Sequence, residues 1–180
     1  MKKIMKATKI VAKIIEIAHW IGVGFMTAIA ICTAVAPQLL GKLLDTNMVY
    51  AEAYGFTIVL LDGNGEFSRT AYCLFAVSAV FLCALVAMIF RNINLIIKKA
   101  EASTPFHKDN IRRMREIGIF SIAIPVVGLV MSVITRIVVG WAGSSITISL
   151  DGFVMGIIVL SLTQFFTYGA ELENDTEGLL

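Results

Sequence analysis

Apolar residues along this chain fall into four long blocks rather than into the short stripes of a water-soluble fold. The blocks run over residues 17–36, 71–90, 117–139 and 152–168, and the second contains no charged residue. A hydrocarbon core about 30 Å thick is crossed by about 20 apolar residues in a helix. The pattern predicts an all-α integral membrane protein, a four-transmembrane-helix bundle that forms a single membrane domain over residues 1–180.

Composition favours lipid as the surroundings of these blocks. Hydrophobic residues make up 58% of the chain and charged residues 16%, against about 45–50% and about 25% in soluble domains. The formal net charge of +2 is too small to indicate nucleic-acid binding by itself. We therefore expect the lipid bilayer as a partner, and no direct nucleic-acid binding.

The first block also has features of a secretory signal peptide. It follows a basic start and ends in Ala34-Val35-Ala36, a sequence that resembles a cleavage site. However, the block is longer than a signal core of about 7–15 residues, and Pro37 would oppose cleavage just before it. We expect an uncleaved transmembrane span.

The distribution of Lys and Arg predicts the orientation, because cytoplasmic loops carry an excess of these residues. Of the 15 basic residues, all but three lie before residue 14 or between residues 91 and 115. The three others are Lys42, Arg69 and Arg136. We therefore expect an external loop over 37–70, a cytoplasmic loop over 91–116, a cytoplasmic tail over 169–180 and both termini in the cytoplasm.

The external loop contains a candidate β-hairpin. Phe56–Leu61 is an apolar run rich in β-branched residues, and the turn sequence Asp62-Gly63-Asn64-Gly65 follows it. Glu66–Arg69 could return as a second strand. We expect a small hairpin over the outer ends of the helices, either as a shielding lid or as a surface that senses a ligand.

The cytoplasmic loop contains a candidate amphipathic helix that leads along the membrane surface into the third span. Thr104 suits the helix cap and Pro105 the first helical position, while Asp109 is an alternative cap. Two pairs of opposite charge lie four residues apart: Asp109 with Arg113, and Arg112 with Glu116.

The basic face of this helix permits two interpretations. It could anchor the loop among anionic lipid head groups, or it could be a docking surface for a cytoplasmic partner. The candidate docking residues are Thr104, Pro105, Phe106, Asn110, Arg112, Arg113 and Arg115. No aromatic residues alternate with the basic ones, which argues against nucleic-acid stacking.

The same loop carries a family resemblance. Thr104-Pro105-Phe106, Asn110 and the run Arg113–Gly118 resemble the signature of a bacterial membrane family, domain of unknown function 2975. The order of spans and the tail Gly169–Asp175 are also similar, although the chain departs from the family ending over Thr176–Leu180. The resemblance implies a multi-pass protein of the bacterial plasma membrane, of unassigned activity, with a helix-turn-helix regulator as a partner.

Ionisable residues near the spans are candidates for function or for helix pairing. Glu16 and His19 are three residues apart and share a face of the first span. They are interpreted as interfacial residues that could pair with each other. Arg136 and Asp151 flank the short connection between the third and fourth spans, and we expect an outer salt bridge between them.

Small residues in the later spans predict how the helices pack. Gly152 and Gly156 form a GxxxG pattern, which permits close helix approach within the chain or between two copies in a homodimer. Pro125 should kink the third span.

No motif for catalysis is present. The chain has no phosphate-binding glycine loop, no GxSxG and no HExxH. Cys32, Cys73 and Cys83 have no zinc-ligand spacing, although a disulfide between the first two is conceivable. We therefore expect no enzyme activity, no catalytic residues, no cofactor and no metal site.

The leading functional hypothesis is a regulatory or signal-relaying membrane protein. Acidic residues of the tail complement the basic residues of the loop, so the two could clasp each other and a partner could compete for one of them. Two alternatives stay open: a small transporter or channel subunit, and self-protection against membrane-active peptides.

Overall fold

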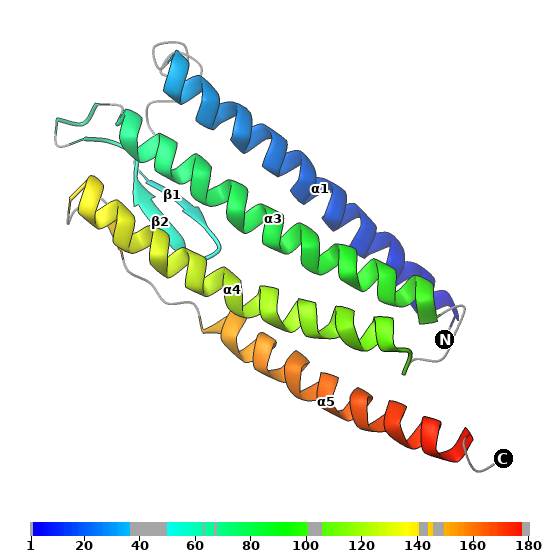
Figure 1. Cartoon of the computed structure of the whole chain (residues 1–180). Coiled ribbons are helices and arrows are strands. Elements are labelled where there is room, and N and C mark those ends of the chain that lie inside the picture. Colours follow the sequence, from blue (N-terminus) through cyan, green and yellow to red (C-terminus); the bar gives the residue numbers. More distant parts are fainter. Residues whose placement is uncertain are drawn as a thin grey trace. The chain divides into compact units, whose positions relative to one another are not determined.

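The computed structural model describes most of the chain, namely residues 2–36, 50–62, 64–66, 68–100, 106–140, 144–145 and 150–177. Its described part contains four long helices: α1 (Lys2–Val35), α3 (Arg69–Ala100), α4 (Lys108–Val138) and α5 (Asp151–Glu177). Three short strands accompany them: β1 (Tyr50–Ala53), β2 (Phe56–Val59) and β3 (Ser144–Ser145) (Figure 1).

All four helices are long and apolar enough to cross a membrane. The most apolar windows lie in α3 and α4, with mean hydropathies of 2.8 and 2.5, against 1.8 in α1 and 1.6 in α5. The mainly helical fold with a small sheet is therefore confirmed, and the helices extend beyond the apolar blocks that predicted them.

The helices and the sheet divide into two compact units. Unit 1 comprises Met1–Ala18, Leu85–Ala123 and Asp151–Leu180, and unit 2 comprises His19–Ala84 and Ile124–Leu150. Parts of α1, α3 and α4 contribute to each unit, whereas α5 belongs to unit 1 and the sheet to unit 2.

In unit 2, β1 and β2 form an antiparallel hairpin in which Ala53 pairs with Phe56. Tyr54 and Gly55 join the strands, with φ angles of 52° and 83°. Two positive φ values in a two-residue connection are typical of a type I′ turn, whose twist suits a hairpin. β3 pairs with the other side of β2, so the strand order is β1-β2-β3.

The core of unit 2 forms where one face of this sheet meets the helices. Phe56, Ile58 and Leu60 alternate along the chain, and their side chains are at most 2% exposed. They belong to one cluster with Tyr72 of α3 and Met131 of α4. Alternation of this kind is typical of a sheet that packs one face against a core.

The predicted hairpin was partly wrong. A strand at Phe56–Val59 is confirmed, but its strand partner β1 precedes it, and no strand is assigned over Glu66–Arg69, where α3 begins at Arg69. The chain nevertheless turns back after Asp62 as expected: the Asp62 N–H donates to the Glu66 carbonyl at 2.8 Å, and the Ser68 N–H donates to the Leu60 carbonyl at 3.0 Å. The Asp62 carboxylate also accepts the backbone N–H groups of Asn64 and Glu66, both at 2.9 Å, in an Asx-type turn.

A basic side chain links the C-terminal end of α1 to the start of α3. Ser68 accepts the backbone N–H of Ala71 at 3.4 Å and so caps α3. The Arg69 guanidinium donates to the carbonyls of Thr33, at 3.1 Å, and Ala34. These are carbonyls in the last turn of α1, where a cation is favourable.

In unit 1, α4 and α5 approach closely at two glycines. A Cβ added to Gly156 would lie 2.8 Å from the Gly118 carbonyl oxygen and 2.4 Å from a side-chain carbon of Ile122. A Cβ at Gly118 would lie 2.7 Å from Leu160. Gly156 of the predicted GxxxG pattern therefore serves packing within the chain, and its partner Gly118 was not foreseen in that role.

The structure also bears on the conceivable disulfide and on the helix that contains Pro125. Cys32, Cys73 and Cys83 are all free thiols, so the conceivable disulfide is absent. Pro125 lies inside α4, which continues as one helix from Lys108 to Val138. The amphipathic segment is thus the first part of α4 rather than a separate surface helix.

Candidate functional site

The candidate site lies in unit 1, where α4 begins. α4 starts at Lys108 and is capped by His107, whose Nδ1 accepts the backbone N–H of Asp109 at 3.2 Å. The His107 carbonyl oxygen accepts the N–H of Asn110 at 2.8 Å. The alternative cap was therefore wrong, because Asp109 lies inside the first turn. Thr104 and Pro105, the other expected cap and first position, lie outside the described residues.

The charges along this part of α4 are paired in a partly unexpected way. Arg112 donates to Glu116 at 3.0 Å, as the spacing predicted. Asp109, however, lies 3.4 Å from the Lys99 ammonium of α3 rather than pairing with Arg113. Arg113 reaches Asn92 of α3 at 3.5 Å instead. Helical spacing predicted the pair Arg112 with Glu116, but it carries no information about partners on the neighbouring α3.

Phe106, a candidate docking residue, packs against α5. Its ring centroid lies 5.5 Å from that of Phe166. A Cβ added to Gly169 would lie 2.6 Å from the Phe106 ring, so the absence of a side chain there makes room for it. Phe106 thus packs the start of α4 against α5, and the residue keeps an exposed fraction of 36%.

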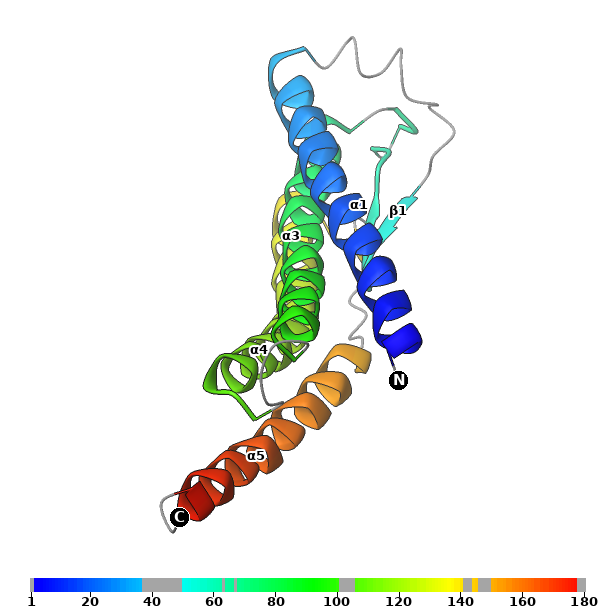
Figure 2. The same ribbon diagram turned by 90° about the vertical axis from the view of Figure 1, so that its right-hand side faces the viewer.

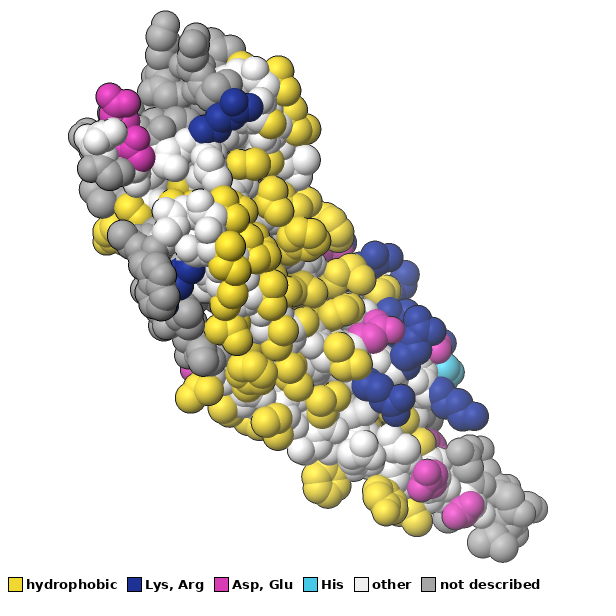
Figure 3. Space-filling view, turned by 60° about the vertical axis from the view of Figure 1, so that its left-hand side comes forward, with side chains coloured by type: hydrophobic (Ala, Val, Ile, Leu, Met, Phe, Trp, Pro, Cys, Tyr) yellow, Lys and Arg dark blue, Asp and Glu magenta, His cyan; other side chains and the backbone are white. Residues whose placement is uncertain are grey.

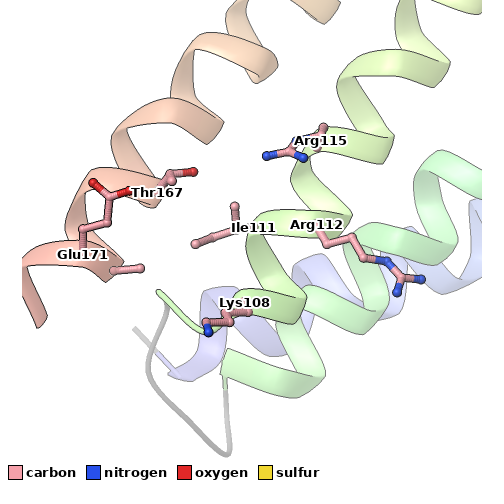
Figure 4. Close-up of a pocket in the computed structure, with 7 residues that line it drawn as sticks. Lys108, Ile111, Arg112, Arg115, Thr167 and Glu171 are labelled. Atoms are coloured by element: carbon pink, nitrogen blue, oxygen red, sulfur yellow. The ribbon is translucent and has the colours of Figure 1, made fainter. Parts of the chain in front are cut away.

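A pocket of about 390 Å³ opens beside this contact, between the first turns of α4 and the last part of α5. Its lining residues are Lys108, Ile111, Arg112, Arg115, Thr167, Ala170 and Glu171. Figure 4 shows α4 contributing one wall and α5 the other, with Arg112 extending away from α5. The pocket therefore combines basic side chains on α4 with a carboxylate on α5.

Basic side chains also gather on the surface. Figure 3 shows Lys and Arg side chains close together on one part of the surface and hydrophobic side chains over a broad area beside it. Arg112 and Arg115 are exposed, Arg113 is half-buried, and Asn110 is only 1% exposed. Of the candidate docking residues that the structure describes, Arg112 and Arg115 are therefore open to a partner, together with part of Phe106.

A buried polar network lies elsewhere in unit 1. Glu16 of α1 is 7% exposed and accepts a hydrogen bond from Asn94 of α3 at 2.8 Å. Lys13 donates to the other Glu16 oxygen at 3.1 Å. A pairing of Glu16 with His19 stays a prediction. His19 belongs to unit 2, where it is hydrogen-bonded to the Tyr54 hydroxyl.

The remaining predicted pair, Arg136 with Asp151, joins residues of different units. Arg136 lies in the last turn of α4 and Asp151 in the first turn of α5. A salt bridge between them stays a prediction. Within the described residues, no group of three or more His, Cys, Asp or Glu side chains could hold a metal ion.

These features define the class of the protein as far as the fold allows: a mainly helical chain with four helices long and apolar enough to cross a membrane. No protein-family model, no curated protein and no solved structure matches the chain. The resemblance to domain of unknown function 2975 therefore stays a prediction.

Proposed function

We propose that this chain is a multi-pass protein of the bacterial plasma membrane that relays a signal through its cytoplasmic side. The membrane part is supported by large apolar side chains that stand exposed on the helices, such as Ile21 at 67%, Phe25 at 61% and Phe165 at 71%. Lipid is the environment in which such surfaces are normal. The excess of Lys and Arg near the N-terminus and in the middle loop favours cytoplasmic termini.

One observation carries the signalling part: the basic first turns of α4 and the acidic last part of α5 line the same pocket. Lys108 and Arg115 of α4 face Glu171 of α5 across it. This common lining supports the proposed clasp between loop and tail. An acidic segment of a cytoplasmic partner would bind the two cations by displacing Glu171.

Salt should weaken such a complex, because exposed charges are screened over about 8 Å at physiological ionic strength. Removing the internal competitor should strengthen it. Substitutions at the two walls are thus expected to act in opposite directions, which distinguishes competition from a general loss of structure.

The experiment places a photo-crosslinking amino acid at Ala170 in the full-length protein, in its native membrane. We expect a protein adduct that is lost in Lys108→Gln/Arg115→Gln and increased in Glu171→Gln. Arg91→Gln is the matched control, because Arg91 is an exposed cation of unit 1 outside the pocket. An adduct that all four proteins form equally, or adducts with lipid alone, would refute the docking function.

A small transporter or channel subunit is the second candidate, and the sheet of unit 2 favours it. A sheet packed along apolar helices introduces backbone edges that lipid cannot satisfy. Substrate flux into proteoliposomes would support this candidate. Self-protection against membrane-active peptides stays a hypothesis, to be tested by peptide sensitivity of a deletion strain.

A further inference from the structure

The hairpin of unit 2 reaches far along the helices rather than lying over their outer ends. The Tyr54 hydroxyl at its tip is hydrogen-bonded to His19 of α1. Arg69 marks the outer end of α1 through its hydrogen bond to the Thr33 carbonyl. The fourteen residue-to-residue steps from His19 to Thr33 correspond to about 21 Å of helix. The expectation of a hairpin over the helix ends was therefore wrong.

The other two helices place the tip at a similar depth. Gly128 is in the middle of the apolar block of α4, and a Cβ there would lie 3.9 Å from the Tyr54 carbonyl oxygen. Gly22 of α1 is three residues from His19, and a Cβ added there would lie 3.6 Å from the Cys83 sulfur of α3. Cys83 is well inside the apolar block 71–90. In both views β1 and β2 run beside the helices (Figure 1, Figure 2).

The two faces of the hairpin differ in polarity. Ala51, Ala53 and the alternating residues of β2 pack against the core. The opposite face, which we call the vestibule face, consists of Tyr50, Glu52, Thr57 and Val59, which stay half-buried or exposed. It carries one carboxylate and two hydroxyl groups, whereas the core-facing side is wholly apolar.

The edge of β1 adds backbone groups that pair with no described strand. Among the strands that the structure describes, β1 lies at the edge of the sheet and beside β2 only. Residues that flank a two-residue turn form a hydrogen-bonded pair, here Ala53 with Phe56, and such pairs alternate along a hairpin. The N–H and C=O groups of Tyr50 and Glu52 therefore point to the free edge.

Within the hydrocarbon region, backbone groups outside helices are tolerated only where protein buries them or where they line a water-filled cavity. We propose that the vestibule face and the free edge of β1 line a water-filled vestibule, open to the outer side, that admits small hydrophilic solutes as deep as Tyr54. This inference rests on the membrane-crossing part of the proposed function and not on the docking part.

Lipid and a second copy of the chain would each fit the vestibule face less well than water. Lipid against this face would surround the charge of Glu52, which is costly at membrane depth. A second copy that paired edge to edge through β1 with Glu52 opposite Glu52 would place two carboxylates together, and facing like charges destabilise a sheet. Water satisfies both the carboxylate and the backbone edge.

The test is thiol labelling in intact cells with a charged, membrane-impermeant methanethiosulfonate reagent added outside. The parent protein has all three native cysteines replaced by Ala. Single cysteines then report on two neighbouring positions at the same depth, Glu52→Cys on the vestibule face and Ala53→Cys on the core face. Thr57→Cys is a second reporter on the vestibule face, and Asn64→Cys in the outer turn is the topology control.

We expect Glu52→Cys and Thr57→Cys to react at rates close to that of Asn64→Cys. Ala53→Cys should react more slowly than both, because half-buried Ala53 packs against the core cluster. Each variant must elute as the cysteine-free parent does in detergent, so that reactivity does not report misfolding.

Three results would overturn the inference. Reaction at Asn64→Cys without reaction at Glu52→Cys and Thr57→Cys would show that no water reaches the sheet, while leaving the membrane topology intact. Equal reaction at Ala53→Cys would show that the hairpin does not pack on the helices. Reaction at Asn64→Cys only after the cells are opened would refute the orientation, and the proposed function with it.

Discussion

Units 1 and 2 both contain parts of α1, α3 and α4, but they differ in the element that packs against them. In unit 1 that element is α5, and glycines on α4 and α5 allow the two backbones to approach. In unit 2 it is a three-stranded sheet, held by buried side chains of β2. A helix satisfies its backbone internally, whereas a sheet exposes an edge.

This difference explains where each unit carries its chemistry. Unit 1 needs no further partner for its backbone, so its polar features are side chains: the pocket on α4 and α5 and the buried Glu16 with Asn94. In unit 2 the edge of β1 adds backbone groups to the polar side chains, and water or protein has to satisfy them.

The largest expected effect concerns the sheet side of the comparison. Phe56 is fully buried, so Phe56→Ala should lower the free energy of unfolding by about 3–5 kcal/mol. Val59→Ala, on the other face of the same strand, should cost much less. Denaturant titration in detergent micelles measures both, and equal effects would contradict the assignment of the two faces.

The glycine contact of unit 1 should be the next most sensitive feature. Gly156→Ala places a Cβ within 2.8 Å of the Gly118 carbonyl oxygen, which a backbone group cannot easily avoid. Overpacking of this kind costs about 1–3 kcal/mol. Gly24→Ala is the control, since nothing lies within 4 Å of its added Cβ. If both variants unfold alike in the same titration, the close approach of α4 and α5 is wrong.

The buried carboxylate of unit 1 should contribute by a similar or smaller amount. Glu16→Ala leaves the Asn94 amide without its acceptor, which costs about 1–3 kcal/mol for a buried group. Lys6→Ala, at an exposed position on the same helix, should change little. A double-mutant cycle with Asn94→Ala isolates the pair, and a coupling energy of zero would contradict the network.

The smallest effect tests the charge of the vestibule face. In the cysteine-free parent carrying Thr57→Cys, a further Glu52→Gln change should slow a cationic thiol reagent relative to an anionic one. Thr57 faces Glu52 across the strands, and a unit charge about 8 Å away in water changes such a rate about twofold. An unchanged ratio of the two rates would mean that Glu52 does not face the path of the reagent.

The sequence predicted the helices well because their signal is local. Long apolar blocks identify four membrane-length helices without knowledge of their neighbours, and the pair Arg112 with Glu116 follows from helical spacing alone. Gly156 was likewise recognised as a packing position, because small residues in apolar helices have few other uses.

Features that depend on contacts between distant segments were missed. The Tyr54-Gly55 turn was not predicted, because a tyrosine at positive φ is an uncommon turn residue and the sequence after residue 61 is the stronger turn signal. Likewise, nothing near Asp109 in the chain indicates that Lys99 of another helix lies 3.4 Å away. The depth of the hairpin, too, depends on His19, which is 35 residues from Tyr54.

The central claim, that the chain crosses the membrane four times with both ends inside, is tested most directly by reporter fusions. Green fluorescent protein at either terminus should fluoresce, because it folds in the cytoplasm. Alkaline phosphatase inserted between Asn64 and Gly65 should be active, because that turn faces outward. Termini on opposite faces, or an inactive phosphatase at Asn64, would contradict the account.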